Sequence, residues 1–278
     1  MPTFPTLAPI TAKLTVGGAR VRVIASDRSD TVVRVEPIDA ANKTDQKVVE
    51  NTKVDFFAGE LSVETKKAGG RDGSVAITVE LPTGSDLVFQ IAKSDVRAEG
   101  VFGDCDLQMA SGQVRLDRVA ALRARLASGD VEVAHVAGPS TVDGATADLR
   151  FAELDGTLTY EGANGKVWIG HARASVTLSG ASGSFTIDRA DADVTAKAAA
   201  CPIRIGRLTR GTTELMNASH GIEIGIAEGT AAWVDAKSTK GSVRSTLPPQ
   251  ENPEEFAEQV KVYARTRLDD IVIQRATV

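Results

Sequence analysis

The sequence is poor in the residues that cross-link small secreted domains and build metal sites. Its 278 residues include only two cysteines and three histidines. Cys105 and Cys201 lie 96 residues apart and fall at different positions of the repeat that fills most of the chain, so we expect two free thiols rather than a disulfide. This cysteine usage is typical of a reducing compartment and excludes a disulfide-stapled fold.

Aromatic residues and long apolar runs are also scarce. Phe, Trp and Tyr make up 4% of the chain, so a core has to be filled mainly by Val, Ile, Leu and Ala. No window approaches eighteen consecutive apolar residues, and the sequence therefore predicts no membrane-spanning helix. Residues 1–10 have neither the basic stretch nor the apolar run of a secretory signal, which leads us to expect a cytoplasmic protein.

The charge balance is mildly acidic. The formal net charge is -5 and the sequence pI is about 5.4. This argues against a non-specific nucleic-acid binder, although a local basic face remains compatible with it. No phosphate-cradling glycine loop before a helix and no Gly-x-Ser-x-Gly elbow is present, so we expect no cofactor.

What the sequence does have is a short phrase that recurs about every eighteen residues. Clear copies read Ser-Gly-Gln-Val-Arg-Leu (111–116), Ser-Gly-Asp-Val-Glu-Val (128–133), Asn-Gly-Lys-Val-Trp-Ile (164–169) and Ser-Gly-Ser-Phe-Thr-Ile (182–187). We count the small turn residue as position 0, which places it at Ser94, Gly112, Gly129, Ala147, Gly165, Gly183, Cys201, His220, Gly241 and Asp269. The steps between copies are 18, 17, 18, 18, 18, 18, 19, 21 and 28 residues.

The apolar residues of the repeat alternate with polar ones, as in half-buried strands. Position +2 is apolar in every copy, and position +4 fails only at Ser245. Position +7 adds a small or apolar residue, for example Val101 and Leu154, and a second strand with inward positions at -7 and -5 precedes each turn. We expect Phe151 and Phe185 inside the core, and a left-handed backbone at the turn glycines Gly165 and Gly183.

These features predict an all-β fold, a parallel β-helix or solenoid of about 18-residue coils. Residues one period apart would then lie on adjacent coils, about 4.8 Å apart. The apolar spacing fits a right-handed coil better than the hexapeptide pattern of left-handed ones. A flattened β-roll and a stack of antiparallel meanders remain alternatives.

The repeat divides the chain into three predicted parts. Residues 1–92 form an N-terminal antiparallel β cap, with a hairpin at Ala58–Gly59 and helix-like composition over 40–51. Residues 93–247 form the coils. Residues 248–278 contain a charged, proline-bearing loop followed by a closing β-hairpin of 260–266 and 271–275, with a helix over 254–263 as the alternative.

The repeated phrases, together with the segment from Ile222 to Trp233 and the closing residues 262–266 and 270–273, resemble a known family. It is the bacterial β-strand-repeat family labelled "putative adhesin", a domain of unknown function. The resemblance covers nearly the whole chain and implies a β-helical fold. It brings no catalytic residue with it.

Two outward columns of the repeat are candidates for binding. Position +3 places Arg115, Arg150, Trp168 and Arg204 in a guanidinium-rich strip that would suit a carboxylated glycan, a phosphate or an acidic partner. The alternative is a solvated strand face on which long side chains cover the sheet. Position +6 stacks His135, Glu153 and His171, which could in principle ligate zinc, but no cysteine or other fourth ligand joins them, so we predict no metal.

The leading hypothesis is a non-enzymatic scaffold or interaction module that presents a rigid face to a protein partner or to itself. No convergent set of catalytic residues is evident, so we name none. The alternative is a carbohydrate-binding or carbohydrate-active protein, either a lyase or a hydrolase, that uses the Arg/Trp strip on an acidic glycan.

Overall fold

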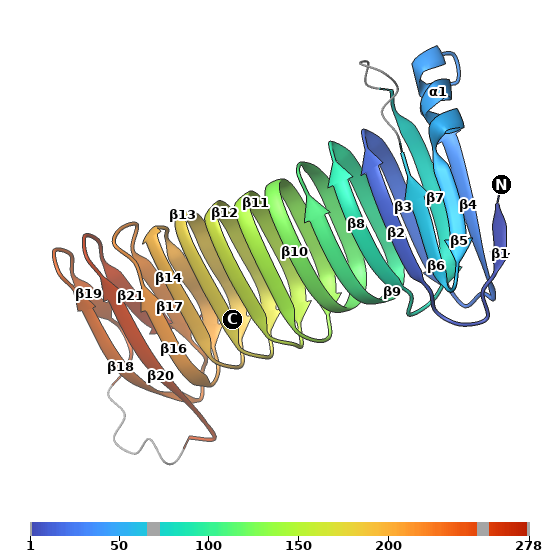
Figure 1. Cartoon of the computed structure of the whole chain (residues 1–278). Helices are drawn as coiled ribbons and strands as arrows, with labels where there is room; N and C mark the ends of the chain where they lie inside the picture. The colour runs from blue at the N-terminus through green and yellow to red at the C-terminus, as the bar shows by residue number, and fades with distance from the viewer. Residues whose placement is uncertain (1, 66–72, 249–255, 277–278) are drawn as a thin grey trace. The chain divides into compact units, whose positions relative to one another are not determined.

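The computed structural model describes residues 2–65, 73–248 and 256–276 (Figure 1). Within these residues the fold is all-β with one short helix, and the chain forms two compact units, residues 1–137 and 138–278. The first unit contains α1 (Lys43–Asn51) and the strands β1 (Thr3–Pro5), β2 (Thr11–Gly17), β3 (Ala19–Ser26), β4 (Asp30–Pro37), β5 (Lys53–Phe57), β6 (Glu60–Glu64), β7 (Val75–Pro82), β8 (Asp86–Ala92), β9 (Ser94–Met109) and β10 (Gly112–Val136).

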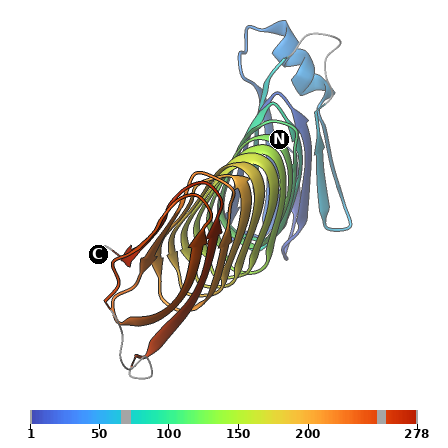
Figure 2. The ribbon, with the colours of Figure 1, turned by 90° about the vertical axis from the view of Figure 1, so that its left-hand side faces the viewer.

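The second unit consists of strands alone in its described residues. They are β11 (Ser140–Leu154), β12 (Leu158–Ala172), β13 (Val176–Ala190), β14 (Val194–Ala200), β15 (Ile203–Leu208), β16 (Gly211–Met216), β17 (Ile222–Ile226), β18 (Thr230–Ser238), β19 (Val243–Ser245), β20 (Glu258–Thr266) and β21 (Ile271–Arg275). Figure 2 views this unit from the side of β18–β21 and shows successive repeats as arches.

The sequence period becomes a parallel ladder. In the second unit Leu149 pairs with Val167 and Val167 with Phe185, each eighteen residues further on. In the first unit Val96 pairs with Val114 in the same way. Residues one period apart are therefore direct neighbours on adjacent strands, as expected from the repeat, and the pairing is mostly parallel in both units.

The inward positions of the repeat form the core. Residues at +2 and +4 are buried from Val96 to Ile224, and Phe151 and Phe185 are fully inside. The Tyr160 ring meets the Phe185 ring edge-on, with centroids 6.0 Å apart. Gly180 leaves room for the Phe185 ring, since an added Cβ there would lie 2.9 Å from Phe185 Cζ in a close-packed interior.

Two predicted core residues are not buried. Val101 is 45% exposed, because an extra residue between Ala98 and Val101 shifts the register and Phe102 takes the inward place opposite Val119. Val243 is 42% exposed, because β19 belongs to the last layer and covers no further strand among the described residues. The apolar pattern therefore fails at Val101 because of a bulge and at Val243 because its strand is in the outermost layer.

The turn glycines are required for two different reasons. Gly183 has a φ of 120°, in the region that favours glycine, whereas Gly165 does not have such a backbone. At both positions an added Cβ would overlap a carbonyl of the preceding repeat, that of Ala147 for Gly165 and that of Gly165 for Gly183. The left-handed expectation is therefore correct for Gly183 and wrong for Gly165, where close backbone approach is the reason.

The N-terminal segment is only partly the antiparallel cap expected from the sequence. The hairpin β5–β6 turns at Ala58–Gly59 as predicted, and β1 and β4 also pair antiparallel. However, β2 pairs in parallel with β6 and β8, and β3 pairs in parallel with β7 and β9. The helix α1 begins after Asn42, whose side chain accepts the Thr44 N–H and so caps it.

The predicted closing hairpin at the C-terminal side is wrong. Strand β20 lies between β16 and β18, and β21 lies between β17 and β19, with parallel pairing on both sides of each. The alternative helix is also wrong for 258–263, which belong to β20. Residues 249–255 of the predicted loop lie outside the described residues.

In both units a layer of two strands close to the chain end is inserted one layer inward. A layer here means the two strands of one repeat, such as β16 with β17. The layer β20–β21 lies between β16–β17 and β18–β19, and in the first unit β2–β3 lie between β6–β7 and the strands β8 and β9 (Figure 1). The layer β18–β19 covers β20–β21, and the layer β6–β7 covers β2–β3. Neither inserted layer can therefore fray unless the layer that covers it opens first.

Candidate functional site

An outward column of the second unit carries the residues that the sequence predicts for binding. Parallel register joins Arg150 to Trp168, Trp168 to Thr186, Thr186 to Arg204 and Arg204 to Glu223. We call these five residues the arginine strip. Arg115 belongs to the first unit, where it stands opposite Arg97 and pairs with Glu132 at 3.3 Å.

The indole of Trp168 is in contact with a neighbouring arginine. The Arg150 guanidinium carbon lies 3.7 Å from the ring centroid, which is a cation–π contact. The ring also leans toward Gly170, where an added Cβ would meet the indole edge at 2.9 Å. A sugar could stack on the indole face that Arg150 covers only by displacing the guanidinium. The N–H groups of Arg150 can still donate to an acceptor.

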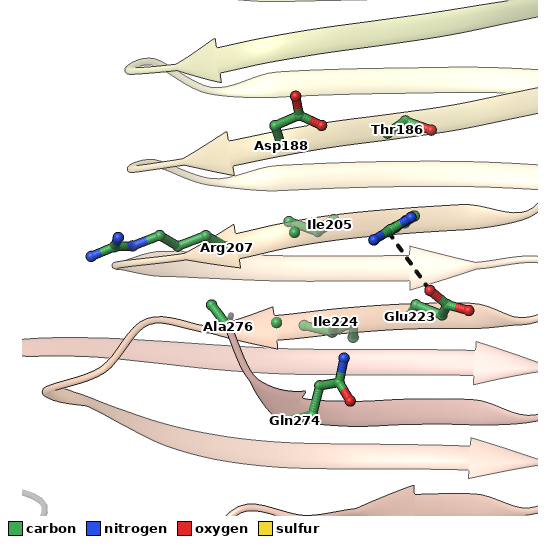
Figure 3. Close-up of a pocket in the computed structure, with 11 residues that line it drawn as sticks. Thr186, Asp188, Ile205, Arg207, Glu223, Ile224, Gln274 and Ala276 are labelled. Atoms are coloured by element: carbon green, nitrogen blue, oxygen red, sulfur yellow. Dashed lines mark ion pairs between the residues drawn. The ribbon is translucent and has the colours of Figure 1, made fainter. Parts of the chain in front are cut away.

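Beside the strip runs a trough with a floor of very small residues. Its floor is Gly206 and Gly225, and its walls include Thr186, Asp188, Arg207 and Gln274, around about 360 Å³ of open space (Figure 3). Figure 3 shows Thr186 and Asp188 on one side, Gln274 on the other, and Arg207 pointing toward the end of its strand. An added Cβ on Gly225 would overlap the Gly206 carbonyl, so backbone approach creates this floor.

A loose ion pair borders the trough. Arg204 Nε lies 3.7 Å from Glu223 Oε2, and both side chains are mostly exposed (Figure 3). On its other side lies a wider depression of about 820 Å³, whose lining includes His220, Lys240 and Leu268. Exposed pairs of this length contribute little to stability. The guanidinium is therefore available to a carboxylate that can approach it more closely.

The column at position +6 does not form a metal site. Glu153 stands opposite His171 in the register of β11 and β12, but Glu153 pairs with Arg173 at 3.1 Å and His171 with Asp191 at 2.7 Å. His135 is a half-buried residue of the first unit. Among the residues that the structure describes, no cluster of three His, Cys, Asp or Glu could hold a metal ion.

Asp191 is the centre of a corner network that sequence reasoning missed. Burial by itself would raise the pKa of its carboxyl, but hydrogen bonds from Arg189 and His171 outweigh this and lower the pKa from 3.8 to about 2. The Arg210 Nε–H donates to the Asp191 carbonyl at 2.8 Å. The network ties three consecutive repeats together at their corner, which is a structural role.

We expect Asp191→Asn to remove an acid-labile part of the stability. A depressed folded-state pKa contributes stability that is present above pH 3.8 and is lost as the pH falls toward 2. The variant should therefore lose about 1 kcal/mol at pH 7, since solvent screens the partly exposed network, and differ little from the parent at pH 2. Urea unfolding at both pH values measures this.

Asp188→Asn is the matched control, because Asp188 is exposed and carries no ion pair within the described part of the chain. It should leave the difference between pH 7 and pH 2 unchanged. An equal loss at both pH values for Asp191→Asn would contradict the assigned role.

The two thiols offer no reactive nucleophile. Cys105 and Cys201 are free and buried. Burial raises the pKa of both thiols, so neither provides a thiolate at neutral pH. They behave as small core residues.

The trough was missed because the sequence analysis did not consider position +5 of the repeat. Position +5 reads Ala152, Gly170, Asp188, Gly206 and Gly225 in the second unit. Four of these five residues are Gly or Ala, and this was the available signal. The repeat period does not show that the backbone at Gly206 and Gly225 lies uncovered between two rows of longer side chains.

No family model and no curated protein matches the sequence. Structures similar to it include a "putative adhesin" from Bacteroides fragilis, with 11% identity, a TM-score of 0.44 and coverage of 98% of this chain and 95% of that one. Another from Parabacteroides distasonis has 12% identity, a TM-score of 0.44 and the same coverage. A "putative lipid binding protein" from Parabacteroides distasonis has 10% identity, a TM-score of 0.34 and coverage of 99% and 96%.

At these identities and TM-scores the similarity assigns neither a family nor a function, so the family resemblance stays a prediction. Within the described residues, no helix is both long enough and apolar enough to cross a bilayer.

Proposed function

We propose that this chain is a non-enzymatic interaction module whose second unit presents the arginine strip and the trough to an acidic segment of a protein partner. The observation that carries this is the in-register column that holds Arg150 and Arg204, of which Arg204 lines the trough with its floor of glycine backbone. Guanidinium groups donate two parallel hydrogen bonds to a carboxylate, and the bare floor lets an extended chain approach Arg204.

The proposal includes a parallel β-helix, right-handed, as the scaffold. Parallel pairing of residues eighteen apart and the inward columns within each unit support this. Such a scaffold holds its outward side chains at strand spacing before a partner binds. The backbone does not have to become ordered on binding, so little conformational entropy is lost. We also propose a cytoplasmic location, which the free and buried cysteines support.

The alternative of an acidic glycan has less support. Stacking on sugars needs an open aromatic face, and Arg150 covers one face of Trp168 at 3.7 Å. Catalysis would need two acids in reach of one another in a groove. In the trough Asp188 is accompanied by Glu223, which pairs with Arg204. The experiment below therefore distinguishes glycan binding from binding of an acidic peptide.

The test is binding of the full chain to short poly-L-glutamate and, separately, to polygalacturonate. The double variant Arg150→Ser with Arg204→Ser should bind poly-L-glutamate at least about tenfold more weakly. Its melting temperature should change by less than about 2 °C, since both side chains are outward. The variant Arg125→Ser, at an exposed position of the first unit outside the predicted strip, is the control and should bind as the parent does.

Unchanged binding by the double variant would reject this face. Retention on polygalacturonate but not on poly-L-glutamate, abolished by Trp168→Ala, would support the glycan alternative instead.

A further inference from the structure

A second surface, independent of the arginine strip, lies at the outermost layer of the second unit. Strand β18 pairs with β20, and β19 pairs with β21. In the part of the chain that the structure describes, no strand lies on the far side of 233–238 or of Val243–Ser245. Such an edge presents backbone N–H and C=O groups that can pair with an added strand.

The apolar columns of the core end open at this layer. Val234 and Ala236 are only half-buried, whereas the residues aligned with them in β20, Val262 and Ala264, are fully buried. On the other side of the layer Val243 is 42% exposed and its partner Ile271 is not exposed at all. Another strand with apolar residues at alternate positions would complete both columns.

The outermost layer also carries positive charge in an acidic protein. Residues 229–248 contain one acid, Asp235, against Lys237, Lys240 and Arg244, a net charge of +2 in a chain of -5. Asp235 is held by Arg265 at 2.6 Å and Arg244 by Asp270 at 3.2 Å. Lys237 and Lys240 have no ion pair among the described residues and are exposed.

We propose that this edge binds an extended acidic segment of another protein, with apolar residues at every second position, as an added strand. The main chain of the segment pairs with the edge, its apolar side chains close the open columns, and its carboxylates meet Lys237 and Lys240. A second copy of this chain is the poorer occupant, since two such edges bring like charges together. Lysines on an edge strand oppose self-pairing in this way and still admit an acidic partner.

The experiment uses the full chain and a fluorescent peptide of about ten residues that alternates Glu and Val, which is the length of a long strand. Fluorescence anisotropy measures its affinity. Two changes should each weaken binding at least about tenfold: Lys237→Glu with Lys240→Glu in the protein, and N-methylation of alternate residues along one edge of the peptide. The protein variant should gain affinity for the matching Lys and Val peptide.

Lys166→Glu with Lys197→Glu is the control, because it makes the same charge change on exposed lysines of the second unit away from the edge. It should bind as the parent does. Arg150→Ser with Arg204→Ser should also leave this peptide bound, which separates the edge from the proposed interaction face. Insensitivity to N-methylation, equal loss in the control, or dimers of the parent in sedimentation velocity would overturn the proposal.

Discussion

Deletion of residues 258–278 is expected to cost the second unit two layers, because it removes one layer and unfolds another. The deleted β20 and β21 lie inside the stack, with β18 and β19 as their outer neighbours. Strands β18 and β19 have no other strand partner among the described residues, so they lose their ladders as well. The core residues Leu215, Ile222 and Ile224 of the layer beneath then become an exposed edge.

The size of this effect follows from burial. Val260, Val262, Ala264, Ile271 and Ile273 are at most 1% exposed. Each fully buried Val or Ile side chain contributes about 1.5–3 kcal/mol. The deletion should therefore remove a large part of the free energy of unfolding of the second unit. Circular dichroism should show loss of strand signal, and urea unfolding should show an earlier transition of the second unit.

Point variants in one column provide the matched comparison. Ile271→Ala should cost about 2–5 kcal/mol because it leaves a cavity in an inner layer. Val243→Ala, at the aligned but half-open position of the outermost layer, should cost less than about 1 kcal/mol. Equal costs at the two positions would show that the layer order is wrong.

Replacement of Gly183 by Ala is expected to be the most damaging change at a turn. Its backbone has a φ of 120°, where an L side chain is strained, and the new Cβ would overlap the Gly165 carbonyl of the adjacent repeat. Strain of about 1–2 kcal/mol adds to displacement of a ladder carbonyl. We expect a total loss of more than about 3 kcal/mol in the free energy of unfolding, measured in urea.

Gly59 separates these two causes. It has a φ of 81°, but an added Cβ would meet nothing within 4 Å. Gly59→Ala should therefore cost only the backbone strain, about 1 kcal/mol. If Gly183→Ala cost no more than Gly59→Ala, close approach between repeats would not matter at this turn.

Much of the scaffold could be predicted from the repeat. Alternation along a strand is a local property, so the inward columns from Val96 to Ile224 follow from it directly. Val101 shows the limit, because one inserted residue moves the inward place to Phe102. Such a bulge is chosen by the register of the neighbouring strand, which the segment alone does not contain.

The candidate site could be predicted in part. The period brings Arg150, Trp168 and Arg204 into one column of the second unit, as expected. It did not reveal that Arg150 covers the indole, because this depends on side-chain rotamers rather than on spacing. The Asp191 network was also hidden, since its members come from different positions of consecutive repeats.

The sequence by itself determined the all-β class, the eighteen-residue repeat and most of the side chains that face inward, because a strand exposes its residues alternately whatever surrounds it. Tertiary structure alone decided the order of layers at the two chain ends, where β2–β3 and β20–β21 are inserted rather than outermost. Any strand with the same apolar alternation could pair between two such strands. Which strand does so depends on side-chain packing and on the length of the connecting loops, and the local sequence pattern does not encode either.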